Sequence, residues 1–187
     1  PALIDNIYND IEYKKVPKLD KTVEMLKKIQ KNQEKVLIFT EYHKMQFILR
    51  KTILEIFELD APIINGTTPH RQTLIDEFNQ SIGFHIMILS PRAAGTGLTI
   101  TSANHVIHYT RWWNPAVENQ ATDRGYRIGQ DKDVYVYYPI VKGSENNITV
   151  EEVIDDLLQE KNELTKNIIV PSKDIDTSEV LLRLGLH

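Results

Sequence analysis

The segment NQATDRGYRIGQ, residues 119–130, brings Gln120, Arg124 and Arg127 to one side of an expected helix. At about 100° per residue, these three side chains fall within an arc of roughly 60°. Arginine suits phosphate, because its planar and permanent cation donates two hydrogen bonds to phosphate oxygens. Two interpretations are open: a solvated face with an Asp123–Arg127 ion pair, or a clamp that stabilises charge on a γ-phosphoryl group during nucleotide hydrolysis.

Gly95 and Gly97 lie in the loop-like segment SPRAAGTGLTIT, residues 90–101. Glycine allows positive φ and lets a backbone approach a ligand closely, although a G-x-G pair is also an ordinary flexible turn. The sequence contains no G-x-x-x-x-G-K-[ST] pattern, so the chain has no P-loop of its own. A chain with an arginine clamp and no P-loop can complete a nucleotide site but cannot form one alone.

Thr67, Thr68 and Arg71 lie in the segment NGTTPHR, residues 65–71. We expect Thr68 to cap a helix that has Pro69 at its first position. The free N–H groups of a helix N-terminus favour anions. Capping explains one threonine, whereas two hydroxyls and an arginine together are compatible with a site for a nucleic-acid phosphate.

The adjacent tryptophans Trp112 and Trp113 follow Arg111 in the segment TRWWNP. Neighbouring residues seldom face the same way, so we expect one tryptophan in the core and one exposed. An exposed indole here could contact a sugar-phosphate backbone. The histidines predict no metal site, because His105 and His108 are three positions apart on an expected strand and should face opposite sides.

Composition limits the classes of function. The chain has 187 residues, 41% of them hydrophobic, which is enough for a packed core. Its net charge of −4 opposes binding of nucleic acid by bulk electrostatics, so a polyanion must be held by a few placed residues. The absence of cysteine fits a reducing compartment, and no apolar run reaches the ~18 residues of a membrane span. Because the chain starts at Pro1, we expect it to be part of a longer protein.

The order of the expected elements predicts the fold class. Apolar, β-branched runs typical of buried strands occur at residues 35–40, 62–66, 85–90, 105–110 and 133–141. Amphipathic or capped helices are expected from Asp20, over 42–59, over 69–79 and from Pro115 after Asn114. This alternation predicts a mainly parallel sheet with helices on both faces, whose functional loops follow the carboxyl ends of the strands.

A long helix is expected after the sheet. Thr149 and Glu152 have the spacing of a capping box, and the amphipathic segment that they open ends at Pro171. The remaining tail finishes in a short apolar helix that must dock on another surface.

The blocks quoted above occur in the order found in one family. From about Asp20 to Glu160, the chain resembles the second RecA-like lobe of the Swi/Snf-like ATPases of helicase superfamily two. The matching segments are EKVLIFTEY, NGTTPHRQTLIDEFN, ILSPRAAGTGLTITSANHVIHYTRWWNPAVENQATDRGYRIGQ, VYVYYPIV and TVEEVIDDLLQEK. Tyr126 stands where eukaryotic relatives usually have histidine, which indicates a bacterial or phage branch. Thr99 replaces an asparagine of the family pattern, and Ala94 or Thr96 replaces a glycine.

The resemblance implies an α/β fold, a three-layer RecA-like (P-loop NTPase-like) domain with a mainly parallel sheet. Its expected divisions are a leading segment 1–18, the second lobe 19–145, and a C-terminal brace helix with its tail, 146–187. The brace would pack on a first lobe of the same parent chain, which would explain apolar residues that lack a partner here.

The resemblance also implies roles for individual residues. ATP with Mg²⁺ would be held mainly by the first lobe, and this lobe would add Arg124 and Arg127, with Arg127 as the arginine finger. Gln120 would couple the nucleotide cleft to DNA, and Gly95 and Gly97 would approach the nucleotide. No metal ligand is assigned to this lobe. The residues expected to contact DNA phosphates are Thr67, Thr68, Arg71, Ser90 and Trp113.

The implied parent is a DNA-dependent ATPase that translocates on double-stranded DNA without unwinding it. We expect it in the bacterial cytoplasm, associated with the nucleoid and not with a membrane, and we expect the isolated chain to be inactive. Two alternatives are a non-catalytic DNA- or protein-binding module and the second lobe of an RNA helicase. The two retained arginines oppose the first alternative, and the WNP and RIGQ segments oppose the second.

Overall fold

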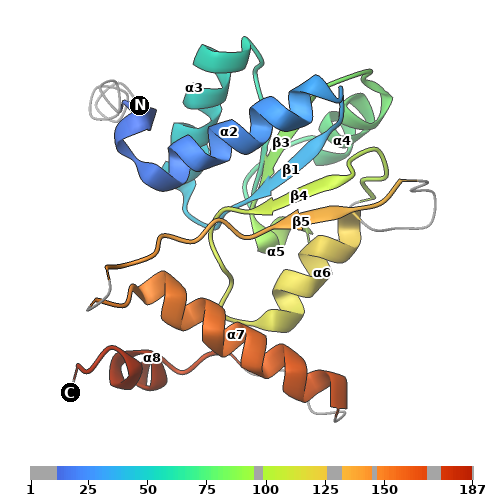
Figure 1. Cartoon of the computed structure of the whole chain (residues 1–187). Helices are drawn as coiled ribbons and strands as arrows, with labels where there is room; N and C mark the ends of the chain where they lie inside the picture. Colours follow the sequence, from blue (N-terminus) through green and yellow to red (C-terminus); the bar gives the residue numbers. More distant parts are fainter. Residues whose placement is uncertain (1–11, 95–98, 126–131, 145–146, 168–173, 187) are drawn as a thin grey trace.

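A parallel five-stranded sheet with the strand order β2-β3-β1-β4-β5 forms the centre of the molecule (Figure 1). The computed structural model describes residues 12–94, 99–125, 132–144, 147–167 and 174–186. The strands are β1 (Val36–Phe39), β2 (Ile63–Ile64), β3 (Ile86–Leu89), β4 (His105–His108) and β5 (Tyr135–Tyr137). Every residue of β1, β3 and β4 is buried, as expected of parallel strands covered on both faces. The predicted α/β class is confirmed.

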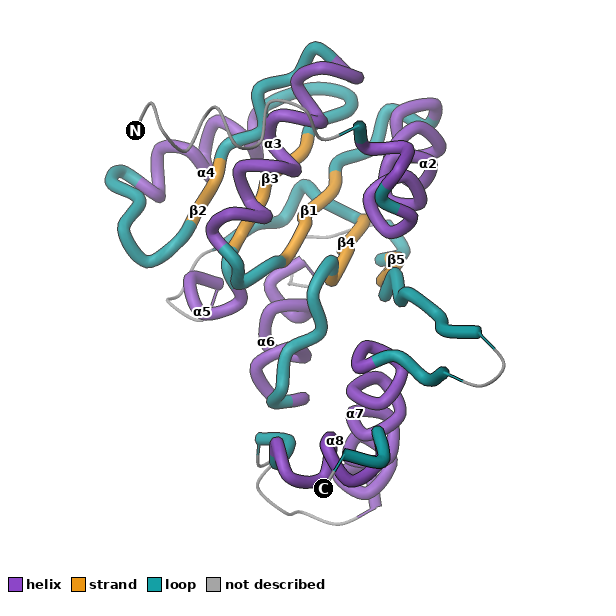
Figure 2. The backbone as a smooth tube through the Cα atoms, turned by 90° about the vertical axis from the view of Figure 1, so that its left-hand side faces the viewer, coloured by secondary structure: helices purple, strands orange, loops and turns teal. Residues whose placement is uncertain are grey.

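Helices cover both faces of the sheet and extend beyond one end of it (Figures 1 and 2). They are η1 (Tyr13–Lys15), α2 (Pro17–Lys31), α3 (His43–Phe57), α4 (Arg71–Gln80), α5 (Pro91–Ala94), α6 (Pro115–Gly125), α7 (Val150–Asn167) and α8 (Thr177–Arg183). No helix in the described ranges has the length and apolar character needed to cross a bilayer.

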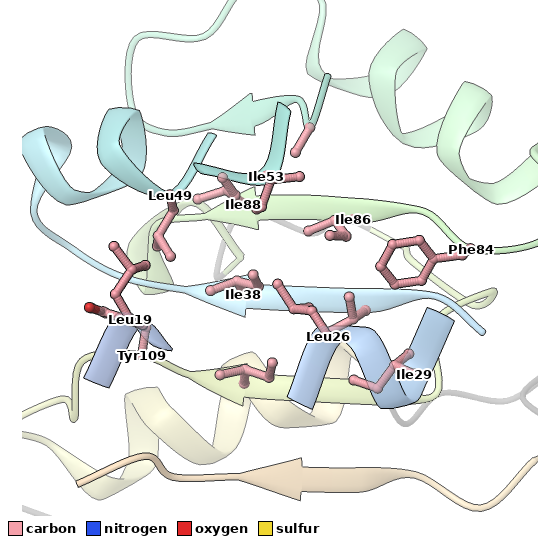
Figure 3. Packing of buried hydrophobic residues seen from close by; sticks show 13 residues of the cluster. Leu19, Leu26, Ile29, Ile38, Leu49, Ile53, Phe84, Ile86, Ile88 and Tyr109 are labelled. Carbon is pink, nitrogen blue, oxygen red and sulfur yellow. The ribbon is translucent and has the colours of Figure 1, made fainter. Parts of the chain in front are cut away.

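Two apolar layers hold the helices on the sheet. On one face, α2 and α3 pack on residues such as Ile38 and Ile88 (Figure 3). On the other face, Ile75 and Phe78 of α4 pack on Leu37 and related residues. Fully burying one such aliphatic side chain contributes about 1.5–3 kcal/mol, so these layers fix the predicted three-layer arrangement.

The structure corrects several predicted boundaries. The helix expected from Asp20 begins at Pro17, within the predicted leading segment. The segment predicted as a strand over 133–141 is regular only over Tyr135–Tyr137. Helix α4 begins at Arg71 and not at Pro69. His70 precedes it with φ 50° and ψ 38°, a left-handed conformation that ends the preceding turn before the helix can begin.

Two predicted helix caps are confirmed. The amide of Ala116 donates to Asn114 Oδ1 at 2.9 Å at the start of α6. At the start of α7, the amide of Glu152 donates to Thr149 Oγ1 at 3.1 Å, and the amide of Thr149 donates to Glu152 Oε2 at 2.9 Å. These reciprocal bonds form a capping box, because each side chain satisfies an amide that the helix cannot.

The brace helix α7 differs from its expected state. Its apolar face is not free, because Val153, Leu157 and Leu158 are buried against Ile175 and Val180 of the segment that contains α8. Both views show α7 and α8 side by side, beyond α6 (Figures 1 and 2). The expectation that these residues lack a partner within the chain was therefore wrong.

Thr149→Ala should lower the free energy of unfolding by about 1 kcal/mol, because it removes one half of the capping box. Thr149→Ser keeps the hydroxyl and should stay close to the wild type. Urea unfolding followed by circular dichroism measures both variants. Equal losses in the two variants would contradict a role for the hydroxyl.

Candidate functional site

The loops after β1, β3 and β4 meet at one edge of the sheet. Thr40 and Thr110, which follow β1 and β4, are joined through their hydroxyls at 2.9 Å. Nearby, the guanidinium of Arg92 lies 5.5 Å from the ring centre of Trp112, and its Nε is 3.9 Å from Glu41 Oε1. This carboxyl edge is where parallel α/β sheets bind their ligands.

Ser90, one of the predicted DNA contacts, is at this edge but is buried. Its hydroxyl accepts a hydrogen bond from the amide of Ala93 at 3.2 Å and so caps the short helix α5. The hydroxyl is only 3 residues from the amide that it satisfies, which makes the contact a local one. Direct contact of Ser90 with a phosphate stays a prediction.

The predicted DNA contacts Thr67, Thr68 and Arg71 are brought together in one turn before α4. The sequence predicted that Thr68 caps α4, but it does not. Its hydroxyl instead accepts from the amide of Asn65 at 2.9 Å and donates to the carbonyl of Ile63 at 3.1 Å. Arg71 folds back, donating to the carbonyls of Thr68 at 3.1 Å and Gly66 at 2.6 Å. Its guanidinium therefore stabilises the turn on which both threonines lie.

A groove of about 670 Å³ runs beside the edge strand β2, between α3 and α4. Thr67 and Thr68 line it at one end. Arg50 and Asp60 also line it and form a two-bond ion pair at 2.6 and 2.7 Å. The groove thus touches the turn before α4, but no described residue of the loops that follow β3 and β4 lines it.

The two tryptophans contact different partners, and both are half-buried. Trp112 lies near Arg92, whereas Trp113 packs against the apolar cluster of α7 and α8. The carbonyl of Trp113 also accepts from the amide of Ile175 at 2.8 Å. The expectation of one exposed tryptophan was wrong, because the C-terminal segment partly covers Trp113, and no local sequence pattern predicts that contact.

The predicted nucleotide-contacting residues are only partly within the described structure. Gln120 and Arg124 belong to α6 (Pro115–Gly125), whose backbone is described. Arg127, Gly95 and Gly97 lie outside the described residues. The roles of all five residues therefore stay predictions. The structure does show how α6 is attached to the sheet.

A buried ion cluster attaches the first turn of α6. Arg111, just after β4, donates through Nε and Nη2 to Glu118 at 3.0 and 2.8 Å. Its Nη1 pairs with Asp155 of α7, and its guanidinium lies 4.2 Å from the ring centre of Tyr138. Glu118 also accepts from the amide of Trp112 at 3.0 Å. Removing one partner of such a buried set costs about 3–5 kcal/mol, since an uncompensated charge remains.

His108 attaches the middle of α6 from the last position of β4. It is fully buried, and its ring stacks on Phe39 and on Tyr138. Its Nε2 lies 2.8 Å from Thr122 Oγ1, and the Thr122 hydroxyl donates to the carbonyl of Glu118 at 3.1 Å. Because that hydroxyl proton is already used, His108 must donate through Nε2; in a neutral ring this is the Nε2–H tautomer. Burial, with a smaller effect of Arg111, lowers the pKa of His108 to about 3.

His105 lies on the opposite face of β4 from His108, as predicted. Its Nε2 is 2.7 Å from Glu34 Oε2, and Asn104 and Lys132 donate to the other oxygen of that carboxylate at 2.8 and 3.3 Å. These hydrogen bonds lower the pKa of Glu34 to about 2, and the one with His105 has the largest effect on that pKa. This cluster is at the amino end of β4, away from the carboxyl-edge loops.

Sequence reasoning missed the ion cluster of Arg111, Glu118 and Asp155. Arg111 drew attention only as a neighbour of the tryptophans. Glu118 is 7 positions beyond Arg111, with a loop between them, and Asp155 lies on another helix. No periodic spacing connects these residues. Only the position of Arg111, a cation just after an expected strand, could have indicated the cluster.

Taken together, the parallel sheet, the strand-end loops and the anchored helix α6 define a RecA-like lobe. The sequence pattern of the helicase conserved C-terminal domain matches residues 17–129, well over half of the chain. The chain belongs to this helicase C-terminal domain family and resembles the second lobe of its Swi/Snf-like ATPases.

Relatives and solved structures agree with this assignment. Zorya protein ZorD of Escherichia coli is 45% identical over 87% of this chain and 16% of its own length. YwqA of Bacillus subtilis, named as an ATP-dependent helicase/translocase, is 44% identical over 81% of this chain and 16% of its own length. The chain thus spans about a sixth of these curated relatives.

Among solved structures, the SWI2/SNF2 ATPase core of Sulfolobus solfataricus is 35% identical, with a TM-score of 0.69. The match covers 91% of this chain and 35% of that one. The same core in complex with double-stranded DNA gives a TM-score of 0.68 at 35% identity, covering 91% and 36%. These likenesses include the C-terminal region that follows the sheet, because they extend over nearly the whole chain.

Because His108 is buried in its neutral form, the free energy of unfolding should fall as the pH falls below about 6.5, the usual pKa of histidine in an unfolded chain. Between that value and the native pKa of His108, about 3, the unfolded chain binds a proton at His108 that the folded chain does not. One such group contributes up to about 1.4 kcal/mol per pH unit. Denaturant unfolding between pH 7 and pH 4.5 measures this slope.

The slope should be smaller in His108→Gln, which has no ring to protonate. His43→Gln, at an exposed histidine, serves as the matched control and should keep the wild-type slope. Glu34 contributes mainly below the usual glutamate pKa of about 4.5. Its effect at the lower end of this window is the same in the wild type and in both variants. A wild-type slope in His108→Gln would contradict the assignment.

Proposed function

We propose that this chain is the second motor lobe of an ATP-dependent translocase on double-stranded DNA. The observation that carries the proposal is its likeness to a SWI2/SNF2 ATPase core solved in complex with double-stranded DNA, at 35% identity over 91% of this chain. The parent protein would also contain a first RecA-like lobe, because this chain has no P-loop. The relatives are several times longer than this chain, which leaves room for that lobe.

In this proposal, α6 and the residues that follow it supply cations to a nucleotide bound by the first lobe. Arg124 and Arg127 contact the triphosphate of ATP, with Arg127 as the arginine finger, and Gln120 links the nucleotide cleft to DNA. Magnesium would be held by the first lobe, where it would neutralise charge on the phosphates. The firm attachment of α6 through Glu118 and Thr122 supports this role, since a finger acts only when its position is fixed.

The DNA contacts in this proposal come from the turn before α4 and from the loops at the carboxyl edge. Arg71 holds the turn of Thr67 and Thr68. Both threonine hydroxyls donate within that turn, so a phosphate would have to take over those hydrogen bonds. Ser90 and Trp113 complete the proposed set. A few placed contacts are required, because the net charge of the chain is −4 and bulk attraction to DNA is weak.

Movement follows from the nucleotide cycle. ATP between the two lobes favours their closure, and hydrolysis removes the bridge that holds them together. Repeated closure would shift the grip of this lobe along the duplex by about one nucleotide per cycle. Translocation therefore requires both lobes, and the isolated chain should bind ATP weakly and turn it over negligibly.

The parent protein should hydrolyse ATP faster with duplex DNA than with RNA or with no nucleic acid. Arg127→Ala in the parent should lower the DNA-stimulated kcat by a factor on the order of 10³, while the affinity for ATP changes little. A coupled ATPase assay and nucleotide titration measure the two quantities.

Lys142→Ala is the matched control, because it removes an exposed cation outside α6. Near-normal turnover in Arg127→Ala would exclude the finger role. Stimulation by RNA instead of DNA would favour the second lobe of an RNA helicase, and DNA binding without any turnover would favour a binding module.

Thr68→Ala combined with Arg71→Ala should weaken DNA binding and lower the slope of log affinity against log salt by about 1. Arg50→Met is the control, because it removes a guanidinium that pairs with Asp60 and not with the turn. Fluorescence anisotropy at several salt concentrations gives the slopes. An unchanged slope in the double variant would remove the turn from the DNA interface.

A further inference from the structure

Arg111 is the residue where the sheet, helix α6 and the brace helix α7 meet. Its side chain is 7% exposed, and those of Glu118 and Asp155 are 1% and 11% exposed. One guanidinium, which follows strand β4, therefore forms an ion pair with a carboxylate on each of two helices. The ring of Tyr138 packs on the same guanidinium. This contact fixes the plane of the guanidinium, and the ion pairs fix its position.

The bond to Glu118 determines the position of α6 more than a single contact would. Both carboxylate oxygens are used, and Oε2 also accepts from the amide of Trp112 at 3.0 Å. Two parallel hydrogen bonds between a planar cation and a planar carboxylate resist rotation as well as translation. The first turn of α6 is thereby held in one orientation against the loop that follows β4.

The distance from this attachment to Arg124, the first of the two arginines proposed to act on ATP, makes the orientation important. Arg124 is six residues beyond Glu118 on the same helix, about 9 Å along its axis at a rise of 1.5 Å per residue. A tilt of α6 by about 10° at Glu118 would move the backbone of Arg124 by roughly 1.6 Å. A displacement of about 1 Å in a catalytic constellation can lower the rate about 10²-fold.

The ion pair with Asp155 adds the brace helix to the same unit. Asp155 Oδ2 accepts from Gln159 one turn later on α7, at 2.9 Å, so the carboxylate is oriented by its own helix. A shift of α7 therefore reaches the guanidinium, and through it Glu118 and α6. Stability alone does not demand this arrangement, because apolar residues of similar volume often stabilise a site as well as a buried ion pair does.

We propose that Arg111 is a positioning residue that ties the orientation of α6, and of Arg124 on that helix, to the docking of the brace helix α7. The proposal rests on the proposed function, in which Arg124 acts on ATP. Its physical content is separate from that function, however: breaking either ion pair should release α6 from its fixed orientation.

A second ion pair of α7 provides a matched control. Lys18 of α2 pairs with Glu151 at 2.8 Å, and its side chain is 9% exposed. This pair also joins the brace to the lobe, but neither of its members contacts the described side chains of α6. Glu151→Gln therefore weakens the docking of α7 without cutting the connection from Arg111 to α6.

The first test is kinetic and uses the full parent protein. Glu118→Gln and Arg111→Lys should lower the DNA-stimulated kcat at least about tenfold, with the KM for ATP within about twofold of the wild type. Asp155→Asn should lower kcat in the same direction, by at least about threefold. Glu151→Gln should leave kcat within about twofold, even if it lowers the melting temperature.

The second test needs no activity. Hydrogen exchange of the α6 amides, followed by mass spectrometry in the parent protein, should be at least about tenfold faster in Arg111→Lys and Asp155→Asn than in Glu151→Gln. Exchange in β1 should stay unchanged, which shows that the lobe remains folded. Asp155→Asn gives the readout if the changes at Arg111 or Glu118 prevent folding.

The outcomes separate the two proposals. A wild-type parent without DNA-stimulated ATP turnover would refute the proposed function, and the exchange experiment alone would then judge Arg111. If the wild type is active, equal losses of kcat in Glu118→Gln and Glu151→Gln would overturn the positioning role. Unchanged exchange of α6 in both Arg111→Lys and Asp155→Asn would overturn it as well.

Discussion

The parallel pairing of β3, β1 and β4 in a single register is the constraint on which the rest of the structure depends. Val36 is opposite Ile86 on one side and His105 on the other, so the three buried strands end at the same level. Their following loops must therefore meet at one edge. The close approach of the hydroxyls of Thr40 and Thr110 and the location of Arg92 near Trp112 are direct consequences of that register.

Helix α6 depends on this edge in two chemically different ways. Arg111 holds its first turn by charge, and His108 holds its middle by a neutral hydrogen bond to Thr122. The two contacts are close, and the nearby guanidinium is one reason why His108 is hard to protonate. A helix fixed at two successive turns can present later residues in a defined place, which is what a lobe that contributes cations to another lobe's nucleotide requires.

The C-terminal helices turn the lobe into a larger unit. The apolar face of α7 is buried against α8 and Trp113, while its acidic residues Glu151 and Asp155 pair with Lys18 and Arg111. Apolar burial gives α7 its affinity for the lobe, and the ion pairs give it one orientation. If Arg111 has the proposed positioning role, the positions of α7 and α6 change together.

The sequence by itself determined the elements and the family. Strands, helices and the caps at Asn114 and Thr149 follow from residues that are neighbours in the chain, and local periodicity records such contacts. The blocks from EKVLIFTEY to RIGQ identified a Swi/Snf-like lobe, and the stripe of Gln120, Arg124 and Arg127 remains a prediction made from helical spacing alone. Only the tertiary structure decided that Thr68 closes a turn, that Trp113 and the brace cover each other, and that Arg111 joins α6 to α7. Those contacts link residues that are distant in sequence or separated by irregular loops, and their choice of partner depends on the packed geometry, which no local pattern encodes.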